Sequence, residues 1–193
     1  FQIFSLEPKV TDEGATFKST YDGSYHHLSP EGSVEVQQKL GSDIQMVLDV
    51  CPPLPSTEAV VRAALERSVL WAGRAKAAQA PARDAGSKQA QFGIVQGGID
   101  VNMREESAKR TAELNFDGYG IGGLSVGETR EQMIPALAAA LAHLPTDRPR
   151  YLMGVGDPAS LVEAVNLGVD QFDCVLQTRL GRHGTALTSS GRV

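Results

Sequence analysis

The strongest constraint on the fold is a regular alternation of short apolar segments and helical segments between residues 44 and 176. The apolar segments have the length of strands, and glycine, acidic or amide residues follow them. Strands that alternate with helices in this way form a parallel sheet. The expected strands are 44–48, 92–95, 119–121, 151–153 and a segment around Asp173, and the expected helices are 56–79, 100–114, 129–143 and 157–168.

Two architectures fit this pattern: an α/β (β/α)8 TIM barrel of which this chain contains only a part, and an open doubly wound sheet. We predict the partial barrel, because each expected strand places its unusual residue at the carboxyl end, where barrel enzymes build their sites. These residues are Asp49, Gln96, Gly122 with Gly123, Met153 with Gly154, and Asp173. Five strands do not close an eight-stranded barrel, so the others are expected outside this chain, mainly before Phe1.

The rest of the chain adds three expected segments within one domain that covers residues 1–193. Residues 15–28 predict an early hairpin that turns at Asp22-Gly23, and Ser29-Pro30 begins a helix that stops at Gly41. Residues 81–88 are expected to form a polar loop, and residues 177–193 a basic loop that faces RNA.

Composition narrows the class of protein. A chain of 193 residues with 41% hydrophobic residues can bury a core. Two distant cysteines give no disulfide framework, which predicts a cytoplasmic protein, and the apolar stretch 134–144 is too short to cross a membrane. The net charge of -5 argues against a general nucleic-acid coat, so RNA contact must come from a local patch. Residues 177–193 contain arginines and no acidic residue, which indicates either such a patch or an ordinary basic surface.

Asp173 is the candidate for chemistry. Phe172, Cys174, Val175 and Leu176 surround it, so the pattern predicts a short buried strand that carries a carboxylate. A buried charge without a partner is costly and requires a reason. The alternatives are a catalytic carboxylate and a structural ion pair with a nearby arginine.

The residues at the strand ends match the edge of a guanine base. Carboxylates such as Asp49 accept hydrogen bonds from the N1-H and N2-H groups of guanine, and the Gln96 amide and a backbone N-H of the glycine pair suit its O6 oxygen. Phe1 and Met153 offer apolar surfaces for the flat ring. The turn at 154–158 either holds a phosphate at a helix N-terminus or simply joins strand to helix, and the first case would suit a barrel enzyme for a phosphorylated metabolite.

The sequence resembles bacterial tRNA-guanine transglycosylase over nearly its whole length. This family exchanges guanine at the wobble position of tRNA for a 7-deazaguanine precursor of queuosine. The matching motifs include Asp49-Val50-Cys51-Pro52-Pro53, Gln96-Gly97-Gly98, Gly122-Gly123-Leu124-Ser125-Val126-Gly127-Glu128, Tyr151-Leu152-Met153-Gly154-Val155-Gly156 and Phe172-Asp173-Cys174-Val175-Leu176.

The resemblance implies a (β/α)8 barrel and a double displacement, in which Asp173 attacks C1′ of the wobble nucleoside and holds the RNA covalently until the new base displaces it. It implies that Asp49 grips the N1 and N2 side of the base, and that Leu124 offers its carbonyl to the aminomethyl group of the incoming base with support from Glu128. The implied base-binding residues are Phe1, Asp49, Cys51, Gln96, Gly122, Gly123, Leu124, Glu128 and Met153. The implied RNA-binding residues are Gly154, Val155, Gly156, Asp157, Pro158, Ala159, Ser160, Thr178, Arg179, Leu180, Gly181 and Arg182.

Further expectations follow from the resemblance. The acid/base aspartate of the family falls before Phe1, and its zinc motif of three cysteines and a histidine falls beyond Val193, so we expect no metal or cofactor in this chain and a structural zinc in the parent protein. A homodimer is expected, with tRNA and a 7-deazaguanine base as partners and no membrane. Gln177 replaces a proline that is usual in the family and is expected to loosen the arginine-bearing loop. A non-catalytic tRNA-binding or partner subunit is the alternative.

Overall fold

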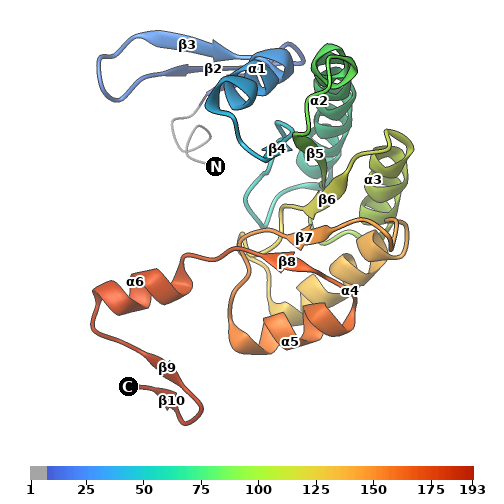
Figure 1. The fold of residues 1–193 in the computed structure, drawn as a ribbon. Helices are drawn as coiled ribbons and strands as arrows, with labels where there is room; N and C mark the ends of the chain where they lie inside the picture. Colours follow the sequence, from blue (N-terminus) through green and yellow to red (C-terminus); the bar gives the residue numbers. More distant parts are fainter. Residues whose placement is uncertain (1–7) are drawn as a thin grey trace.

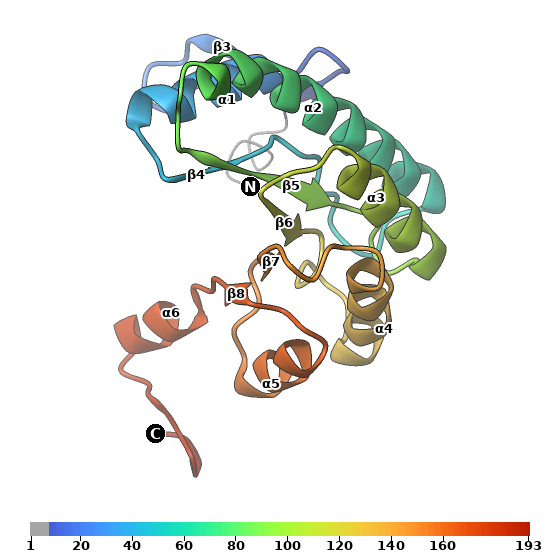
Figure 2. The ribbon, with the colours of Figure 1, turned by 45° about the vertical axis from the view of Figure 1, so that its right-hand side comes forward.

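The computed structural model describes residues 8–193, and its centre is a parallel sheet with the strand order β4-β5-β6-β7-β8. The sheet curls, and the helices that follow β4, β5, β6 and β7 lie on its outer side (Figures 1 and 2). Consecutive order, one hand of curl and helices on one face are the features of a (β/α) barrel, whereas a doubly wound sheet has helices on both faces. The predicted partial barrel is therefore confirmed. The strands are β4 (Ile44–Met46), β5 (Ala90–Val95), β6 (Gly118–Ile121), β7 (Arg150–Leu152) and β8 (Gln171–Phe172).

A continuous apolar core lies between the sheet and the outer helices and joins them. They are α2 (Glu58–Asp84), α3 (Val101–Glu113), α4 (Arg130–Leu141) and α5 (Pro158–Asn166). The core joins Val95, Ile121 and Leu152 of three adjacent strands to alanines of the helices, among them Ala72 and Ala108. Strands buried on both faces explain the near-continuous apolar runs in the sequence.

The chain before β4 forms a small antiparallel sheet and one helix. Strands β1 (Lys9–Val10), β2 (Ala15–Lys18) and β3 (Tyr25–Leu28) pair in order, which confirms the predicted hairpin, and α1 (Pro30–Leu40) follows. Ser29 accepts a hydrogen bond from the N-H of Gly32, as its capping position predicts. Trp71 Nε1 of α2 donates to the carbonyl of Asp12 at 2.8 Å, which joins this sheet to the barrel helices.

Two segments that the sequence predicts as loops form helices or strands over part of their length. Helix α2 continues through Pro81 to Asp84, so the predicted loop at 81–88 is wrong over its first half. A proline in the last turn removes only one helical hydrogen bond, and the Arg83 side chain binds Asp117 from this turn. Residues 177–193, expected as a loop, contain most of α6 (Leu176–Arg182) and a hairpin of β9 (Leu187–Thr188) and β10 (Gly191–Arg192).

The segment from α6 to β10 extends away from the curled sheet (Figure 1). Its helix and hairpin carry the arginines that the sequence assigns to RNA contact. In the part of the chain that the structure describes, no helix has the length and apolar character needed to cross a membrane.

The close packing of Gly93 in β5 against Thr111 and Phe116 gives a test of the core. A methyl group at Gly93 would lie 2.5 Å from Phe116 Cδ2 and 2.7 Å from Thr111 Cγ2, so Gly93→Ala should lower the free energy of unfolding by about 1–3 kcal/mol. A methyl group at Gly73, inside α2, has 4.0 Å to its nearest neighbour, and Gly73→Ala should raise stability by ~0.5–1 kcal/mol. Urea unfolding of both variants checks this, and equal stabilities would contradict the packing.

Candidate active site

The carboxyl ends of β4 and β5 bring Asp49 and Gln96 together. Gln96 directly follows β5 and is 1% exposed, and its Nε2 donates to Oδ2 of the half-buried Asp49 at 2.6 Å. Burial raises the pKa of the Asp49 carboxyl, and the hydrogen bond from Gln96 opposes this shift. Burial and then the charge of Asp49 likewise raise the pKa of the Cys51 thiol. Asp49 is thus a desolvated hydrogen-bond acceptor held by a buried amide.

The glycine pair after β6 packs directly against this amide. A side chain at Gly122 would lie 2.7 Å from Gln96 Nε2, and one at Gly123 would collide with Gln96 Oε1. Gly123 also has φ +65, a conformation that favours glycine. Only two glycines allow the turn to approach the Gln96 side chain this closely.

Gln96 Oε1 is buried and has no hydrogen-bond partner within residues 8–193. An unpaired buried acceptor is unfavourable, and native proteins rarely retain one without a reason. A ligand or a water molecule at this amide would complete its hydrogen bonding.

Arg104 is the functional candidate that the sequence reasoning missed. Its side chain, on α3, is fully buried, and burial lowers its pKa to about 10, so it stays charged at neutral pH. Nε donates to the carbonyl of Gly98 at 2.6 Å and Nη2 to that of Gly123 at 3.0 Å. Nη1 donates to the carbonyls of Val95 at 3.1 Å and Gly122 at 2.7 Å. One guanidinium therefore joins the ends of β5 and β6.

The sequence does carry a signal for this burial. Residues 104, 107, 108 and 111 are spaced as one face of a helix, and all of them are buried. Three of these positions are serine, alanine and threonine in a helix that is otherwise rich in charge. An arginine on such a face is expected to point inward.

Glu128 fixes the loop that follows the glycine pair. Its carboxylate accepts the N-H of Ser125, and its Oε2 accepts the N-H of Val126 at 2.9 Å. In a trans peptide the C=O and N-H groups point in opposite directions, so the Leu124 carbonyl points away from Glu128. Leu54 N donates to Val126 O at 3.1 Å, which ties this loop to the one after β4.

Asp173 is exposed and follows β8, so the expected buried strand around it is wrong. The apolar run does not form one strand, because β8 ends at Phe172 and α6 begins at Leu176. Val175, between them, is 57% exposed. Asp173 Oδ1 accepts hydrogen bonds from the Tyr151 hydroxyl at 2.6 Å and from Gly154 N at 2.7 Å.

The Tyr151 hydroxyl is a dependable donor to this carboxylate. Burial, followed by the hydrogen bond to Asp173, raises the pKa of Tyr151, so the hydroxyl stays protonated at neutral pH. Within residues 8–193 no hydrogen bond reaches the other oxygen, Oδ2. The two contacts therefore fix the carboxylate through one oxygen.

The predicted residues form two groups on one edge of the sheet. Asp49, Gly122 and Gly123 all lie against the Gln96 side chain, whereas Asp173 contacts β7 and the turn after it. Methionines fill the space beside β6. A methyl group at Gly120 would lie 3.2 Å from both Met153 Sδ and Met46 Cε, which explains why β6 carries glycine there. Phe1 lies outside the described residues.

The two segments expected to contact RNA are joined by Gln177. Its Nε2 donates to the carbonyl of Gly156 at 2.7 Å, so this residue ties the start of α6 to the turn after β7. Asp157 Oδ1 caps α5 by accepting from Ser160 N at 3.0 Å, and a carboxylate at this helix end disfavours the phosphate site considered from the sequence. Arg179 and Arg182 are exposed on α6.

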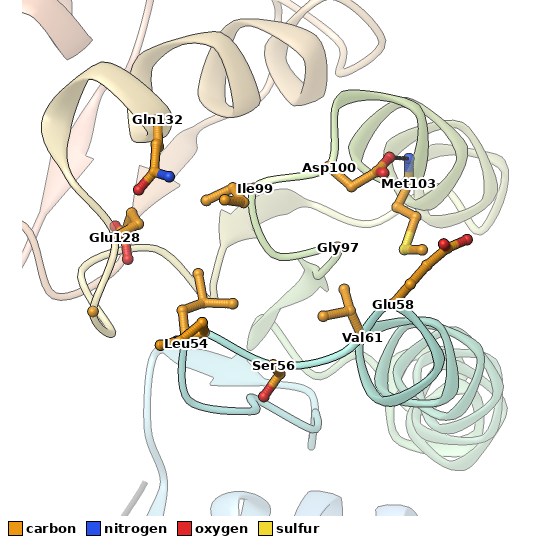
Figure 3. Close-up of a pocket in the computed structure, with 12 residues that line it drawn as sticks. Leu54, Ser56, Glu58, Val61, Gly97, Ile99, Asp100, Met103, Glu128 and Gln132 are labelled. Carbon is orange, nitrogen blue, oxygen red and sulfur yellow. Dashed lines mark hydrogen bonds between the residues drawn. The ribbon is translucent and has the colours of Figure 1, made fainter.

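A cavity of about 460 Å³ is bounded by the loops after β4, β5 and β6 (Figure 3). Leu54, Ile99 and Glu128 line it, whereas Asp49 and Asp173 do not. Of the predicted base-binding residues, only Glu128 is therefore part of the lining of this cavity. Among residues 8–193 no group of three or more His, Cys, Asp or Glu side chains could hold a metal ion.

The fold and its site define a class: part of a (β/α) barrel with carboxylate, amide and glycine groups at the carboxyl edge of its sheet. Comparison with known proteins narrows this class. The family model "Queuine tRNA-ribosyltransferase" matches residues 1–193. The chain is 51% identical to a queuine tRNA-ribosyltransferase of Desulforudis audaxviator and 50% identical to one of Herpetosiphon aurantiacus, in each case over 100% of this chain.

The chain belongs to the queuine tRNA-ribosyltransferase family. It covers 51% of the Desulforudis protein and 48% of the Herpetosiphon protein, so it spans about half the length of the curated relatives it matches. A third relative, from Natranaerobius thermophilus, is 47% identical with 52% of its length covered.

Burial of Asp49 makes stability depend on pH. Because its folded-state pKa is raised from the ordinary 3.8, ionisation opposes folding, and this cost appears as the pH rises above that value. Asp49→Asn cannot ionise, and its side-chain oxygen can still accept from Gln96. The variant should therefore gain more stability over the unaltered protein at neutral pH than at about pH 4. Urea unfolding at both pH values measures this, and a gain that does not change with pH would contradict it.

Proposed function

We propose that this chain carries the base-exchange centre of a tRNA-guanine transglycosylase, which replaces the wobble guanine of tRNA with a 7-deazaguanine precursor of queuosine. The observation that carries the proposal is the Asp173 carboxylate, which Tyr151 and Gly154 hold by one oxygen at the same sheet edge as the Asp49-Gln96 pair. Membership of the family supports it.

Asp173 acts as the nucleophile. Its oxygen forms a bond to C1′ of the wobble nucleoside while the C1′-N9 bond breaks and its electron pair leaves with guanine. Guanine takes up a proton as it leaves. The incoming base then attacks C1′ and gives up its N9 proton, and the carboxylate leaves; the acid/base aspartate that the resemblance places before Phe1 would donate and accept these protons. Two displacements of this kind keep the RNA backbone intact, as in a retaining glycosidase with a base in place of water. The hydrogen bonds to Oδ1 orient the carboxylate for attack through Oδ2.

The group around Asp49 recognises the base. Asp49 accepts the N1-H and N2-H donors of guanine, and the Gln96 amide and the N-H of Gly123 donate to O6. The bond between Gln96 and Asp49 gives way to bonds with the base, within surroundings where burial strengthens each of them. Phe1, Cys51 and Met153 complete the base pocket.

The loop after Gly123 selects the incoming base. Glu128 orients the peptide between Leu124 and Ser125, so that the Leu124 carbonyl is available to an aminomethyl group. A carbonyl acceptor suits the ammonium of an aminomethyl-deazaguanine. This favours that base over queuine as the acceptor.

The tRNA lies along the turn after β7 and along α6. Residues 154–160 contact its backbone, and residues 178–182, with the exposed Arg179 and Arg182, contact the neighbouring nucleotides of the anticodon loop. The whole protein is proposed to be a cytoplasmic homodimer with a structural zinc bound by residues outside this chain, and no step described above is assigned to that metal.

Replacement of the nucleophile tests the proposal. The full-length protein, incubated with an anticodon stem-loop RNA and a tight deazaguanine analogue, should give a slow-migrating covalent band on a denaturing gel. Asp173→Asn should lose this band and lower guanine exchange by at least about 1,000-fold. Asp147→Asn, an exposed aspartate distant in sequence, is the control and should retain both.

Undiminished exchange by Asp173→Asn would contradict the assignment. Absence of the band from both proteins, with RNA binding retained, would instead favour the non-catalytic tRNA-binding subunit.

The arginines of α6 give a second test. Arg179→Ala should weaken binding of the stem-loop RNA and reduce the slope of log affinity against log salt concentration by about 1, because one phosphate contact is lost. Arg148→Ala, which removes an exposed arginine outside α6, is the matched control. Titrations at several salt concentrations measure both slopes, and the same slope for Arg179→Ala and the unaltered protein would exclude a phosphate contact at this arginine.

A further inference from the structure

Arg104 is a buried charge whose partners are all backbone carbonyl groups. No carboxylate within residues 8–193 forms a salt bridge with it, and its hydrogen bonds go to Val95, Gly98, Gly122 and Gly123. Buried charges are usually paired with opposite charges, so this arrangement requires an explanation. One explanation is that Arg104 supports the two glycine turns. Its bonds to the carbonyls of Gly122 and Gly123 have a further consequence.

These two bonds polarise neighbouring peptide groups. Nη1 donates to the carbonyl of Gly122 at 2.7 Å, and the N-H of Gly123 belongs to the same peptide unit. A hydrogen bond to a peptide oxygen draws electron density through the conjugated C-N bond and makes the N-H of that peptide a stronger donor. The bond from Nη2 to Gly123 O acts in the same way on the N-H of Leu124.

We propose that Arg104 is a positioning residue for base exchange, which activates the N-H of Gly123 as the hydrogen-bond donor to the O6 atom of the bound base. This inference rests on the proposed function, because that function assigns O6 to Gly123. When the C1′-N9 bond breaks, its electron pair enters the guanine ring and increases the negative charge on O6. The bond from Gly123 therefore strengthens as the base departs, and a fixed donor of this kind stabilises the transition state.

The geometry requires arginine. A planar guanidinium reaches the carbonyls of Gly122 and Gly123 at the same time, with two different nitrogens. Lysine keeps a positive charge but not this paired geometry, and methionine keeps most of the length and apolar stem without the charge. The two substitutions separate charge from geometry.

The experiment compares guanine with 2-aminopurine, which lacks the O6 atom and with it the N1-H donor, on the full-length protein. Because the hydrogen bonds of Arg104 do not go to Asp49, which accepts N1-H, a change of the guanine to 2-aminopurine ratio in an Arg104 variant reports on the O6 contact. Dissociation constants are measured for the unaltered protein, Arg104→Met, Arg104→Lys and the control Arg110→Met, which removes a surface arginine of the same helix that pairs with Glu66. Arg104→Met should weaken guanine binding about 5- to 10-fold more than 2-aminopurine binding. Arg104→Lys should lie between, and Arg110→Met should leave the ratio unchanged.

Kinetics give a second readout that a purely structural role would not change in the same direction. Because the bond to O6 strengthens in the transition state, kcat for guanine exchange by Arg104→Met should fall by a larger factor than guanine affinity. Thermal unfolding of each variant is recorded beside these measurements.

An equal loss of affinity for both bases in Arg104→Met would overturn the inference while the proposed function remains intact, provided that the unaltered protein exchanges guanine. Failure of both Arg104 variants to fold would also overturn it in favour of a structural role. If the unaltered protein neither prefers guanine to 2-aminopurine nor forms the covalent band, the proposed function and the inference fail together.

Discussion

The candidate site depends on one buried guanidinium that binds backbone carbonyls at the ends of two adjacent strands. Arg104 reaches carbonyls that follow or end β5 and β6, which otherwise need other partners in the interior. Its bonds hold the turn at Gly97-Gly98 and the turn at Gly122-Gly123 in a fixed relation. The Gln96 amide packs against the second of these turns and donates to Asp49.

The curled parallel sheet explains why groups distant in sequence act at one place. In a parallel sheet the carboxyl ends of all strands lie at the same edge, and the curl of the sheet arranges these ends around a common centre. Asp49 and Asp173 lie after the carboxyl ends of β4 and β8, the first and last strands of the sheet. Glycine at 120 in β6 leaves room for Met153, and glycines at 122 and 123 in the turn after β6 leave room for Gln96.

Periodicity predicted the partial barrel and most of the residues at the strand ends, because strand spacing, capping and the rule of carboxyl ends are visible locally. The spacing of residues 104, 107, 108 and 111 indicates a buried helix face, but it does not reveal the role of Arg104, since the acceptors of a buried side chain are set by tertiary packing. The run at 172–176 was read as one strand because apolar residues do not distinguish a strand from the approach to a helix. Pro81 also led the sequence to predict the end of α2 too early. A proline near the last turn of a helix is tolerated, so α2 continues to Asp84.

The two carboxylates of the site occupy opposite environments, and this difference separates their roles. Asp49 is half-buried beside an amide, with its pKa raised, so it is suited to accept hydrogen bonds from a neutral base that shields it from water. Asp173 is exposed, and two donors fix one of its oxygens. An exposed carboxylate can be reached by a polymer that a closed pocket would exclude, whereas a desolvated one discriminates between small planar rings. In the proposed function, the same sheet edge therefore admits a large RNA at β8 and reads a single base at β4 and β5.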